Sequence, residues 1–181
     1  QTGYFVGRIC GLDIRQYGSG NAGTTNVLRT LGKSRALITF LGDALKGMIP
    51  VLIVKLVIGP AVPDLNSELL QLLLGFAVVL GHDFPFFLHF KGGKGIATSA
   101  AVMMGFDWRM GLCCLVIFVV VVAATRYVSL ASTLLSAALI AEILIFYPGR
   151  WDLFVLIVLY AGFAIYRHRA NIKRLLAGTE S

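Results

Sequence analysis

Glycine, hydroxyl and amide side chains are concentrated in residues 18–29, which read Gly-Ser-Gly-Asn-Ala-Gly-Thr-Thr-Asn-Val-Leu-Arg. Glycines let backbone N–H groups approach a ligand closely, and the hydroxyl and amide side chains add further donors. The arginine at the end adds a planar fork of charged donors. This combination favours a bound phosphate group, and the candidate binding residues are Gly18, Ser19, Gly20, Asn21, Gly23, Thr24, Thr25, Asn26 and Arg29.

The three glycines of this stretch also fit the dinucleotide-binding pattern GxGxxG. Asp43 even lies where that pattern expects a ribose-binding acid, about twenty residues further on. The pattern should follow a buried strand in a βαβ unit, however, and the flanks here are apolar runs of helical length. We therefore exclude a dinucleotide-binding fold. The remaining alternative to phosphate binding is a polar turn between two helices.

A second glycine-rich stretch, residues 91–95, reads Lys-Gly-Gly-Lys-Gly and leads directly into an apolar segment. If that segment is a helix, the loop's backbone N–H groups and the positive end of the helix dipole face the same ligand. The stretch is not a P-loop, because a glycine rather than Ser or Thr follows its second lysine. An alternative is a basic loop that binds anionic lipid headgroups. The candidate residues are Lys91, Gly92, Gly93, Lys94 and Gly95.

Several ionisable residues lie within or beside long apolar runs. Asp43 and Lys46 are three residues apart on one face of such a run, so they must face protein or water. A functional carboxylate and an orienting ion pair explain Asp43 equally well. His82 and His168 lie near the ends of their segments, where a histidine can bind phosphate or move a proton. Metal-ligand spacing, a GxSxG serine-hydrolase motif and a His-Asp acyltransferase motif are absent from the sequence.

The composition is that of a membrane protein. Of the 181 residues, 57% are hydrophobic and only 14% are charged, and the mean hydropathy is +0.83. Charged residues make up about a quarter of an average soluble protein. The net charge of +7 does not indicate nucleic-acid binding, because the basic residues are not clustered on an aromatic-studded soluble surface. We expect one domain, residues 1–181.

The apolar runs predict an all-α, polytopic membrane helix bundle. Residues 1–10 are too short to span a bilayer, so we expect them to be the tail of a helix whose beginning is missing. Together with the six runs below, this gives seven transmembrane helices, the first of them truncated. The predicted runs are residues 36–58, 69–90, 96–106, 110–124, 129–147 and 153–166.

The distribution of basic residues predicts the orientation of the bundle. When the connecting segments are assigned to alternate sides, twelve of the sixteen lysines and arginines fall on one side. The other side receives only Arg109 and Arg150. By the positive-inside rule the first side is cytoplasmic. This assignment places residues 18–29, 91–95 and 167–174 on the same membrane face.

Five motifs occur in a recognisable order: GSGNAGTTNVLR from residue 18, DALKG from 43, GHDFPFFLHFKGGKGIAT from 81, RYVSLAS from 126 and YRHRANIKRLLAGTE from 166. Together they resemble the bacterial acyl-phosphate:glycerol-3-phosphate acyltransferase family over nearly the whole chain. The resemblance implies a seven-helix protein of the bacterial inner membrane with cytoplasmic motif loops and C-terminus. It also implies transfer of a fatty acyl group from acyl-phosphate to the sn-1 hydroxyl of glycerol 3-phosphate. Acyl-CoA and acyl carrier protein are not donors in that family, and no cofactor is expected.

The resemblance also assigns roles to individual residues. It implies that glycerol 3-phosphate is bound by Ser19, Arg29, Lys94, His168 and Asn171. The glycines of residues 92–95 and the hydroxyls of the first stretch would then hold the acyl-phosphate group. The catalytic candidates are Ser19, Asn26, Lys94 and His168, and Asp43 and His82 are counted with the substrate-binding residues.

The chemistry of an acyl-phosphate favours direct transfer without an acyl-enzyme. The compound is a mixed anhydride whose phosphate leaves readily once its charge is neutralised, so positioning and electrostatics suffice. The alternatives are a membrane transporter of a phosphorylated metabolite and a lipid-binding scaffold. A transporter keeps its polar groups near the middle of the bilayer, whereas the polar stretches here are predicted to lie on one face.

Overall fold

The computed structural model describes residues 1–180, and every regular element within that range is helical. The predicted all-α class is therefore confirmed. The helices are α1 (Thr2–Ile9), η1 (Ile14–Gln16), α2 (Thr24–Leu31), α3 (Lys33–Ile53), η2 (Val54–Ile58), α4 (Gly59–Ala61), α5 (Ser67–Asp83), η3 (Phe86–Leu88), α6 (Ile96–Phe106), α7 (Trp108–Thr125), α8 (Val128–Phe146), α9 (Trp151–Arg167) and α10 (Arg169–Leu176).

Several of these helices are long and apolar enough to cross a membrane. In the described part of the chain there are four: Lys33–Ala61, Ser67–Leu88, Trp108–Thr125 and Val128–Phe146. Helices α9 and α10 form a fifth candidate if the pair, which is bent by 59°, is one span. The polytopic membrane bundle is thus confirmed. The count of seven spans also needs α1 and the short α6, and it stays a prediction.

Three predicted boundaries were wrong. The run 69–90 was expected to be one helix, but α5 ends at Asp83 and the separate 3-10 helix η3 follows at Phe86–Leu88. The first long run was expected to end at Ile58, but the helix continues through the π-helical turn η2 to Ala61. Pro60 does not stop it, because proline is tolerated in the first turn of a helical segment. A turn of three residues was expected from Asp107, but only Asp107 itself lies between α6 and α7. Its side chain accepts a hydrogen bond from the N–H of Arg109 at 2.9 Å, so α7 begins at once.

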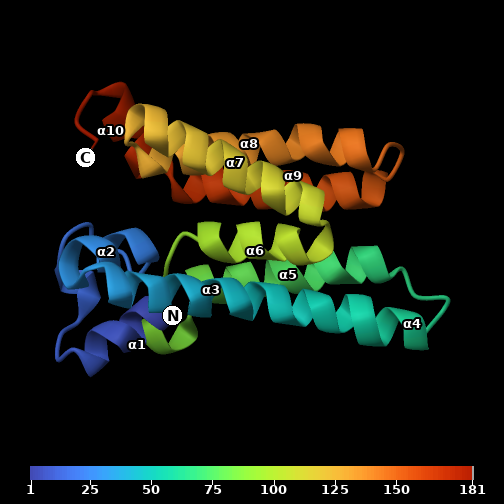
Figure 1. Cartoon of the computed structure of the whole chain (residues 1–181), viewed down its shortest axis with the longest axis horizontal. Coiled ribbons are helices and arrows are strands. Elements are labelled where there is room, and N and C mark those ends of the chain that lie inside the picture. Colours follow the sequence, from blue (N-terminus) through green and yellow to red (C-terminus); the bar gives the residue numbers. More distant parts are fainter. Residues whose placement is uncertain (181) are drawn as a thin grey trace.

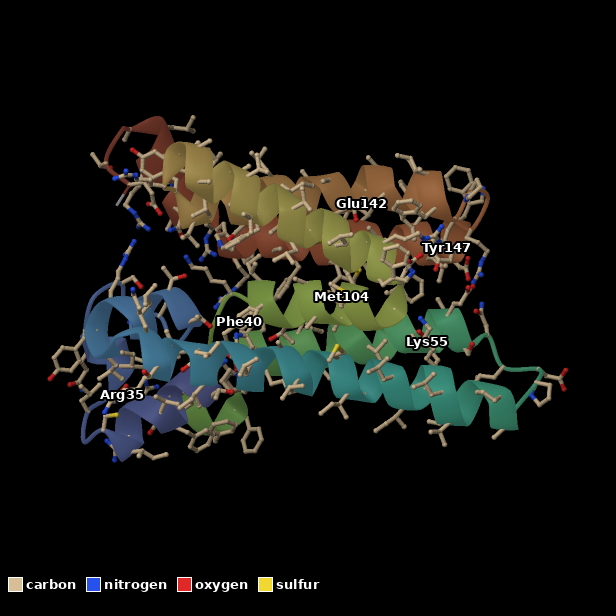
Figure 2. All side chains as sticks on the ribbon, in the orientation of Figure 1. Arg35, Phe40, Lys55, Met104, Glu142 and Tyr147 are labelled. Carbon is tan, nitrogen blue, oxygen red and sulfur yellow. The ribbon has the colours of Figure 1, made fainter. Side chains whose placement is uncertain are left out.

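The long helices form two groups that lie side by side along the bundle (Figure 1). Helices α3, α5 and α6 make one group and α7, α8 and α9 the other, with α6 packed against both α3 and α7. A continuous apolar core joins the groups and includes Val51, Leu72, Met103, Leu135 and Ile157. Figure 2 shows nitrogen and oxygen atoms gathered at the two ends, with mostly carbon between them. This distribution is the one a bilayer requires.

Small residues allow α3 and α6 to approach closely. A Cβ placed on Gly47 would lie 2.7 Å from the carbonyl oxygen of Thr98. The Thr98 hydroxyl donates to the carbonyl of Asp43 at 3.0 Å and is buried. Such contacts are typical of helix pairs in membranes, where close packing replaces the hydrophobic effect. They fix α6 against α3.

Polar and apolar contacts stabilise the two ends of the bundle. At the C-terminal end of α6, Lys55 donates through Nζ to the carbonyls of Gly105 at 3.2 Å and Phe106 at 2.7 Å. These carbonyls have no partner within the helix, so the lysine caps them. At the other end of the bundle a small apolar cluster supports the first glycine-rich loop; its members are Val6, Ile14, Ala22, Val27 and Ala36.

The close approach of α3 and α6 predicts a stability effect. Gly47→Val should lower the free energy of unfolding by about 1–3 kcal/mol, because the new side chain overlaps the α6 backbone. Thermal unfolding in detergent measures this as a lower midpoint. Gly162→Val is the control, since a Cβ placed on Gly162 has no neighbour within 4 Å among the described residues, apart from its adjacent residues and its own helix backbone. Equal midpoints for the two variants would contradict the packing argument.

Candidate functional site

Asn26 holds the first glycine-rich loop together. Its side chain is buried, with 2% exposed, and Nδ2 donates to the carbonyls of Ile14 at 3.1 Å, Tyr17 at 3.0 Å and Asn21 at 2.8 Å. Its Oδ1 accepts from the N–H of Ser19 at 2.9 Å. One amide therefore joins two residues of the loop, Ser19 and Asn21, to the segment that precedes it. Asn26 was predicted as a catalytic candidate, and this geometry gives it a positioning role.

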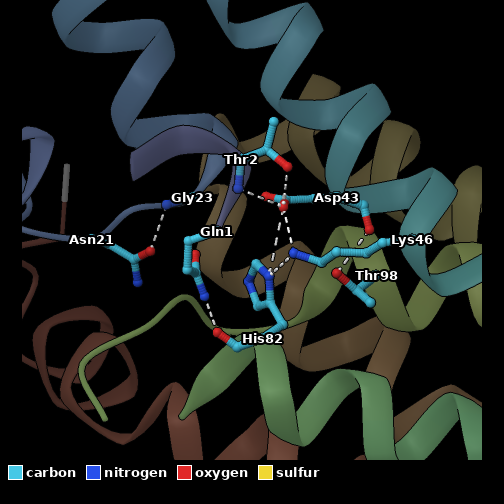
Figure 3. A network of polar contacts seen from close by, with 8 residues as sticks. All are labelled: Gln1, Thr2, Asn21, Gly23, Asp43, Lys46, His82 and Thr98. Carbon is cyan, nitrogen blue, oxygen red and sulfur yellow. Dashed lines mark hydrogen bonds and ion pairs between the residues drawn. The ribbon is translucent and has the colours of Figure 1, made fainter. Parts of the chain in front are cut away.

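The ligand-facing part of the first loop is open. Gly18 and Gly20 adopt φ of 56° and 70°, a conformation that favours glycine. Ser19 is exposed, and the Thr24 hydroxyl is buried without a hydrogen-bond partner in the described residues. Gly23 caps α2, and its N–H donates to Oδ1 of Asn21 at 2.8 Å (Figure 3). The loop thus presents hydroxyl donors at the start of a helix that also carries Thr25 and Arg29.

The second loop, residues 91–95, folds back onto the last turn of α5. The N–H of Gly92 donates to the carbonyl of Asp83 at 3.1 Å, and that of Gly93 to the carbonyl of His82 at 3.3 Å. Helix α6 begins directly after Gly95, as predicted. Among residues 1–180, no acceptor takes the N–H groups of Lys94 and Gly95. These two N–H groups and the first turn of α6 have the arrangement of an anion-binding nest, and their binding of a phosphate stays a prediction.

Lys94 joins the second loop to the C-terminal segment. Its Nζ donates to Oδ1 of Asn171 on α10. Asn171 in turn donates through Nδ2 to Oε1 of Glu180 at 2.6 Å, and Arg174 donates to Oε2 of Glu180 at 2.7 Å. Burial raises the pKa of Glu180, but the hydrogen bonds from Asn171 and Arg174 outweigh it and keep that pKa below its usual value. These bonds therefore hold the C-terminal segment against the second loop.

His168 lies at the bend between α9 and α10 and is 3% exposed. Its Nδ1 is 2.8 Å from the carbonyl oxygen of Ala164. A carbonyl only accepts, so Nδ1 donates, and Nε2 of the neutral ring is left as an acceptor. The backbone thus sets which nitrogen can take a proton from a ligand.

The first loop meets the second across an open hollow of about 390 Å³. Gly20 lines it from the first loop and Lys91 and Gly92 from the second. The other lining residues come from the segments just before each loop: Asp13, Arg15, Gln16, Leu88 and His89. Burial lowers the pKa of Lys94 below its usual value, and the nearby cations Arg174, Arg167 and Arg29 lower it further, against the opposing effect of Glu180. The three predicted stretches converge at one end of the bundle.

Asp43 and His82 lie beneath the second loop in a network of polar contacts (Figure 3). Oδ1 of Asp43 accepts from Lys46 at 2.6 Å and from the Thr2 hydroxyl at 2.8 Å. Nζ of Lys46 is also 2.6 Å from Nδ1 of His82. The predicted pairing of Asp43 with Lys46 is confirmed. The His82 ring fills the space that a Cβ on Gly93 would need. Both residues are enclosed and support the loop, so their direct contact with substrate stays a prediction.

Sequence reasoning missed one charged pair at this end of the bundle. Asp83 is fully buried, and its Oδ2 lies 3.2 Å from Nε of Arg167; this is an ion pair whose geometry, among the described residues, is not that of a hydrogen bond. Nη2 of Arg167 also donates to the carbonyl of Gly93 at 2.7 Å. The sequence did contain a signal for this pair, because an acid follows His82 and an arginine precedes His168. Arg167 was counted only as an orienting charge.

Comparison with known proteins shows the family to which this chain belongs. Residues 1–178 match the family described as glycerol-3-phosphate acyltransferase. The chain belongs to that family. A glycerol-3-phosphate acyltransferase of Thermoanaerobacter sp. (strain X514) is 48% identical over 170 residues, which cover 94% of this chain and 81% of that protein. One from Clostridioides difficile (strain 630) is 47% identical over 181 residues, covering 99% and 86%.

Comparison of the fold with solved structures supports the same family. The crystal structure of PlsY (YgiH), an integral membrane glycerol 3-phosphate acyltransferase in its glycerol 3-phosphate form, matches with a TM-score of 0.88 at 35% identity. The match covers 99% of this chain and 86% of that one. Its lysophosphatidic acid form matches with a TM-score of 0.86. The predicted family and enzyme class, a membrane acyltransferase, are therefore confirmed, and the transporter and scaffold alternatives fall away.

The four hydrogen bonds of Asn26 predict how the first loop responds to its loss. Asn26→Leu should speed amide exchange at Ser19 and its neighbours by about tenfold or more, because it removes all four of these hydrogen bonds. Hydrogen–deuterium exchange with mass spectrometry measures this. Asn21→Leu makes the same chemical change but removes one side-chain bond, so it should affect Gly23 alone. The same exchange pattern in both variants would show that Asn26 does not organise the loop.

Proposed function

We propose that this chain transfers a fatty acyl group from acyl-phosphate to the sn-1 hydroxyl of glycerol 3-phosphate. The products are lysophosphatidic acid and phosphate, and the reaction is the first step of bacterial phospholipid synthesis. It takes place in the inner membrane, with residues 18–29, 91–95 and 167–174 and the C-terminus on the cytoplasmic side. The observation that carries the proposal is the convergence of the first loop, the Lys94 loop and the Asn171 helix at one end of the bundle.

The electrostatics of that end suit two phosphate ligands. Burial lowers the pKa of Lys94, Glu180 raises it, and repulsion from Arg174, Arg167 and Arg29 lowers it. A phosphate dianion relieves this repulsion, so binding is favourable at a site that excludes much of the solvent. We assign Ser19, Arg29, Lys94, His168 and Asn171 to glycerol 3-phosphate, and the nest of the second loop to acyl-phosphate.

The hydrogen-bond donors at the start of α6 support acyl-phosphate as the source of the acyl group. Backbone N–H groups at the start of α6 stabilise charge on a small oxyanion. The phosphate of an acyl-phosphate gains charge as the acyl bond breaks, and the nest lies where that charge can be neutralised. The glycerol hydroxyl can then attack the acyl carbon directly. Its proton passes either to Nε2 of His168 or to a phosphate oxygen of a substrate.

Direct transfer is supported by the surroundings of Ser19. Its backbone N–H bonds to Asn26, but no histidine or carboxylate of residues 1–180 hydrogen-bonds its hydroxyl. A serine nucleophile needs an adjacent base, and this serine has none in the part of the chain described. The Ser19 hydroxyl is therefore assigned to substrate binding.

The donor is tested with purified protein supplied with acyl-phosphate, acyl-CoA or acyl carrier protein as the acyl source. We expect turnover with acyl-phosphate alone, and loss of about a hundredfold or more in Lys94→Ala, because a charged donor to the reacting groups is removed. Lys33→Ala removes an equal charge from the exposed start of α3 and should turn over normally. Turnover with acyl-CoA, or full activity of folded Lys94→Ala, would contradict the proposal.

The direct mechanism predicts that no acyl-enzyme forms. Protein incubated with labelled acyl-phosphate but no glycerol 3-phosphate should keep its unmodified mass, and Ser19→Ala should raise KM for glycerol 3-phosphate while retaining turnover. Intact-mass spectrometry provides the measurement. Ser19→Ala is also the control for acylation elsewhere in the chain. A label present on the wild-type chain and absent from Ser19→Ala would establish a covalent intermediate.

A further inference from the structure

A buried ion pair connects the end of α5 with the end of α9, directly behind the second loop. Asp83 is 0% exposed, and the Arg167 side chain is 18% exposed. The guanidinium also lies over the ring of Phe84, 5.0 Å from its centroid. Burying two charges costs free energy, and apolar residues of similar size often stabilise a protein as well or better. Stability alone is thus a weak explanation for this pair.

The pair contacts the second loop at three points. Arg167 donates to the carbonyl of Gly93 at 2.7 Å. The carbonyl of Asp83 accepts from the N–H of Gly92 at 3.1 Å. Oδ1 of Asp83 would lie 3.0 Å from a Cβ on Gly95, so its carboxylate lies against that glycine. The loop is therefore held on both sides of Lys94.

The contact at Gly93 sets the direction of a ligand-facing donor. The carbonyl of Gly93 and the N–H of Lys94 belong to one planar, trans peptide unit, so they point in opposite directions. When Arg167 holds the carbonyl on one side, the N–H of Lys94 must point to the other. That N–H has no acceptor within the described chain. Arg167 thus orients a donor of the nest without having to touch the ligand itself.

We propose that Asp83 and Arg167 are positioning residues for acyl transfer. Asp83 fixes the guanidinium, the guanidinium fixes the Gly93–Lys94 peptide, and the peptide presents its N–H to the phosphate of the acyl donor. Arg167 also immediately precedes His168. One pair therefore sets the second loop relative to the C-terminal segment. The inference rests on the proposed function, in which this loop binds acyl-phosphate.

The test uses full-length Asp83→Asn, Arg167→Gln and the double variant, with KM for acyl-phosphate and kcat measured separately. A nest that is misaligned for ground state and transition state alike raises KM more than it changes kcat. We expect KM to rise about tenfold or more in each single variant. The double variant should be no worse than the singles, because the two residues act as one unit. Independent, multiplying effects would overturn the pairing.

If loss of a buried charge prevents the other variants from folding, Arg167→Lys provides the test. It keeps the positive charge beside Asp83 but lacks the fork that reaches both the carboxylate and the Gly93 carbonyl. It should raise KM and speed amide exchange at Gly92 and Gly93. Arg150→Gln removes an arginine that pairs with Asp152 at the opposite end of the bundle, and its kinetics should match the wild type.

The exchange measurement needs no substrate, so it separates this inference from the proposed function. Faster exchange at Gly92 and Gly93 in Arg167→Lys supports the positioning role even if the wild-type protein proves to use another acyl donor. Unchanged exchange in folded Arg167→Lys overturns it, and so does wild-type KM for acyl-phosphate.

Discussion

The hydrogen bond from Lys94 to Asn171 is the contact on which the site depends, because it joins segments 77 residues apart. Lys94 reaches Asn171 only if α6 begins just after Gly95 and α9 bends into α10 at His168. Each condition has its own cause. Packing of Thr98 against Gly47 fixes the start of α6, and the bend of 59° turns α10 across the end of the bundle.

Arginines are paired with acids at both ends of the bundle. At the end remote from the site, Arg109 pairs with Asp107 at 2.6 Å and Arg150 with Asp152 at 2.8 Å. At the site end, Arg167 lies 3.2 Å from Asp83 and Arg174 2.7 Å from Glu180. What distinguishes the site end is Lys94, whose pKa is lowered by burial and by the neighbouring arginines, against the opposing effect of Glu180. An anion bound beside Lys94 would offset these effects.

The membrane fold and the grouping of the loops were predictable because they depend on properties that are local in sequence. Hydropathy identifies helices, and the count of basic residues assigns sides, so residues 18–29 and 91–95 could be brought together before any coordinates. Contacts between helices were harder to predict. Asp83 and Arg167 pair because α5 and α9 are neighbours, and no periodicity in either helix reveals that. Likewise, the sequence does not reveal that the amide of Asn26 forms its hydrogen bonds with backbone groups in and beside the loop rather than with a ligand.

The proposed site holds Lys94 in surroundings that disfavour its charge until a phosphate ligand enters. The most direct test is the pKa of the Lys94 ammonium group, measured by nuclear magnetic resonance on labelled protein in detergent, with and without glycerol 3-phosphate. We expect a value below the usual lysine value of about 10.4 in the free protein. It should rise when the dianion binds, because an opposite charge favours the protonated form. An ordinary value that does not change with ligand would contradict the account.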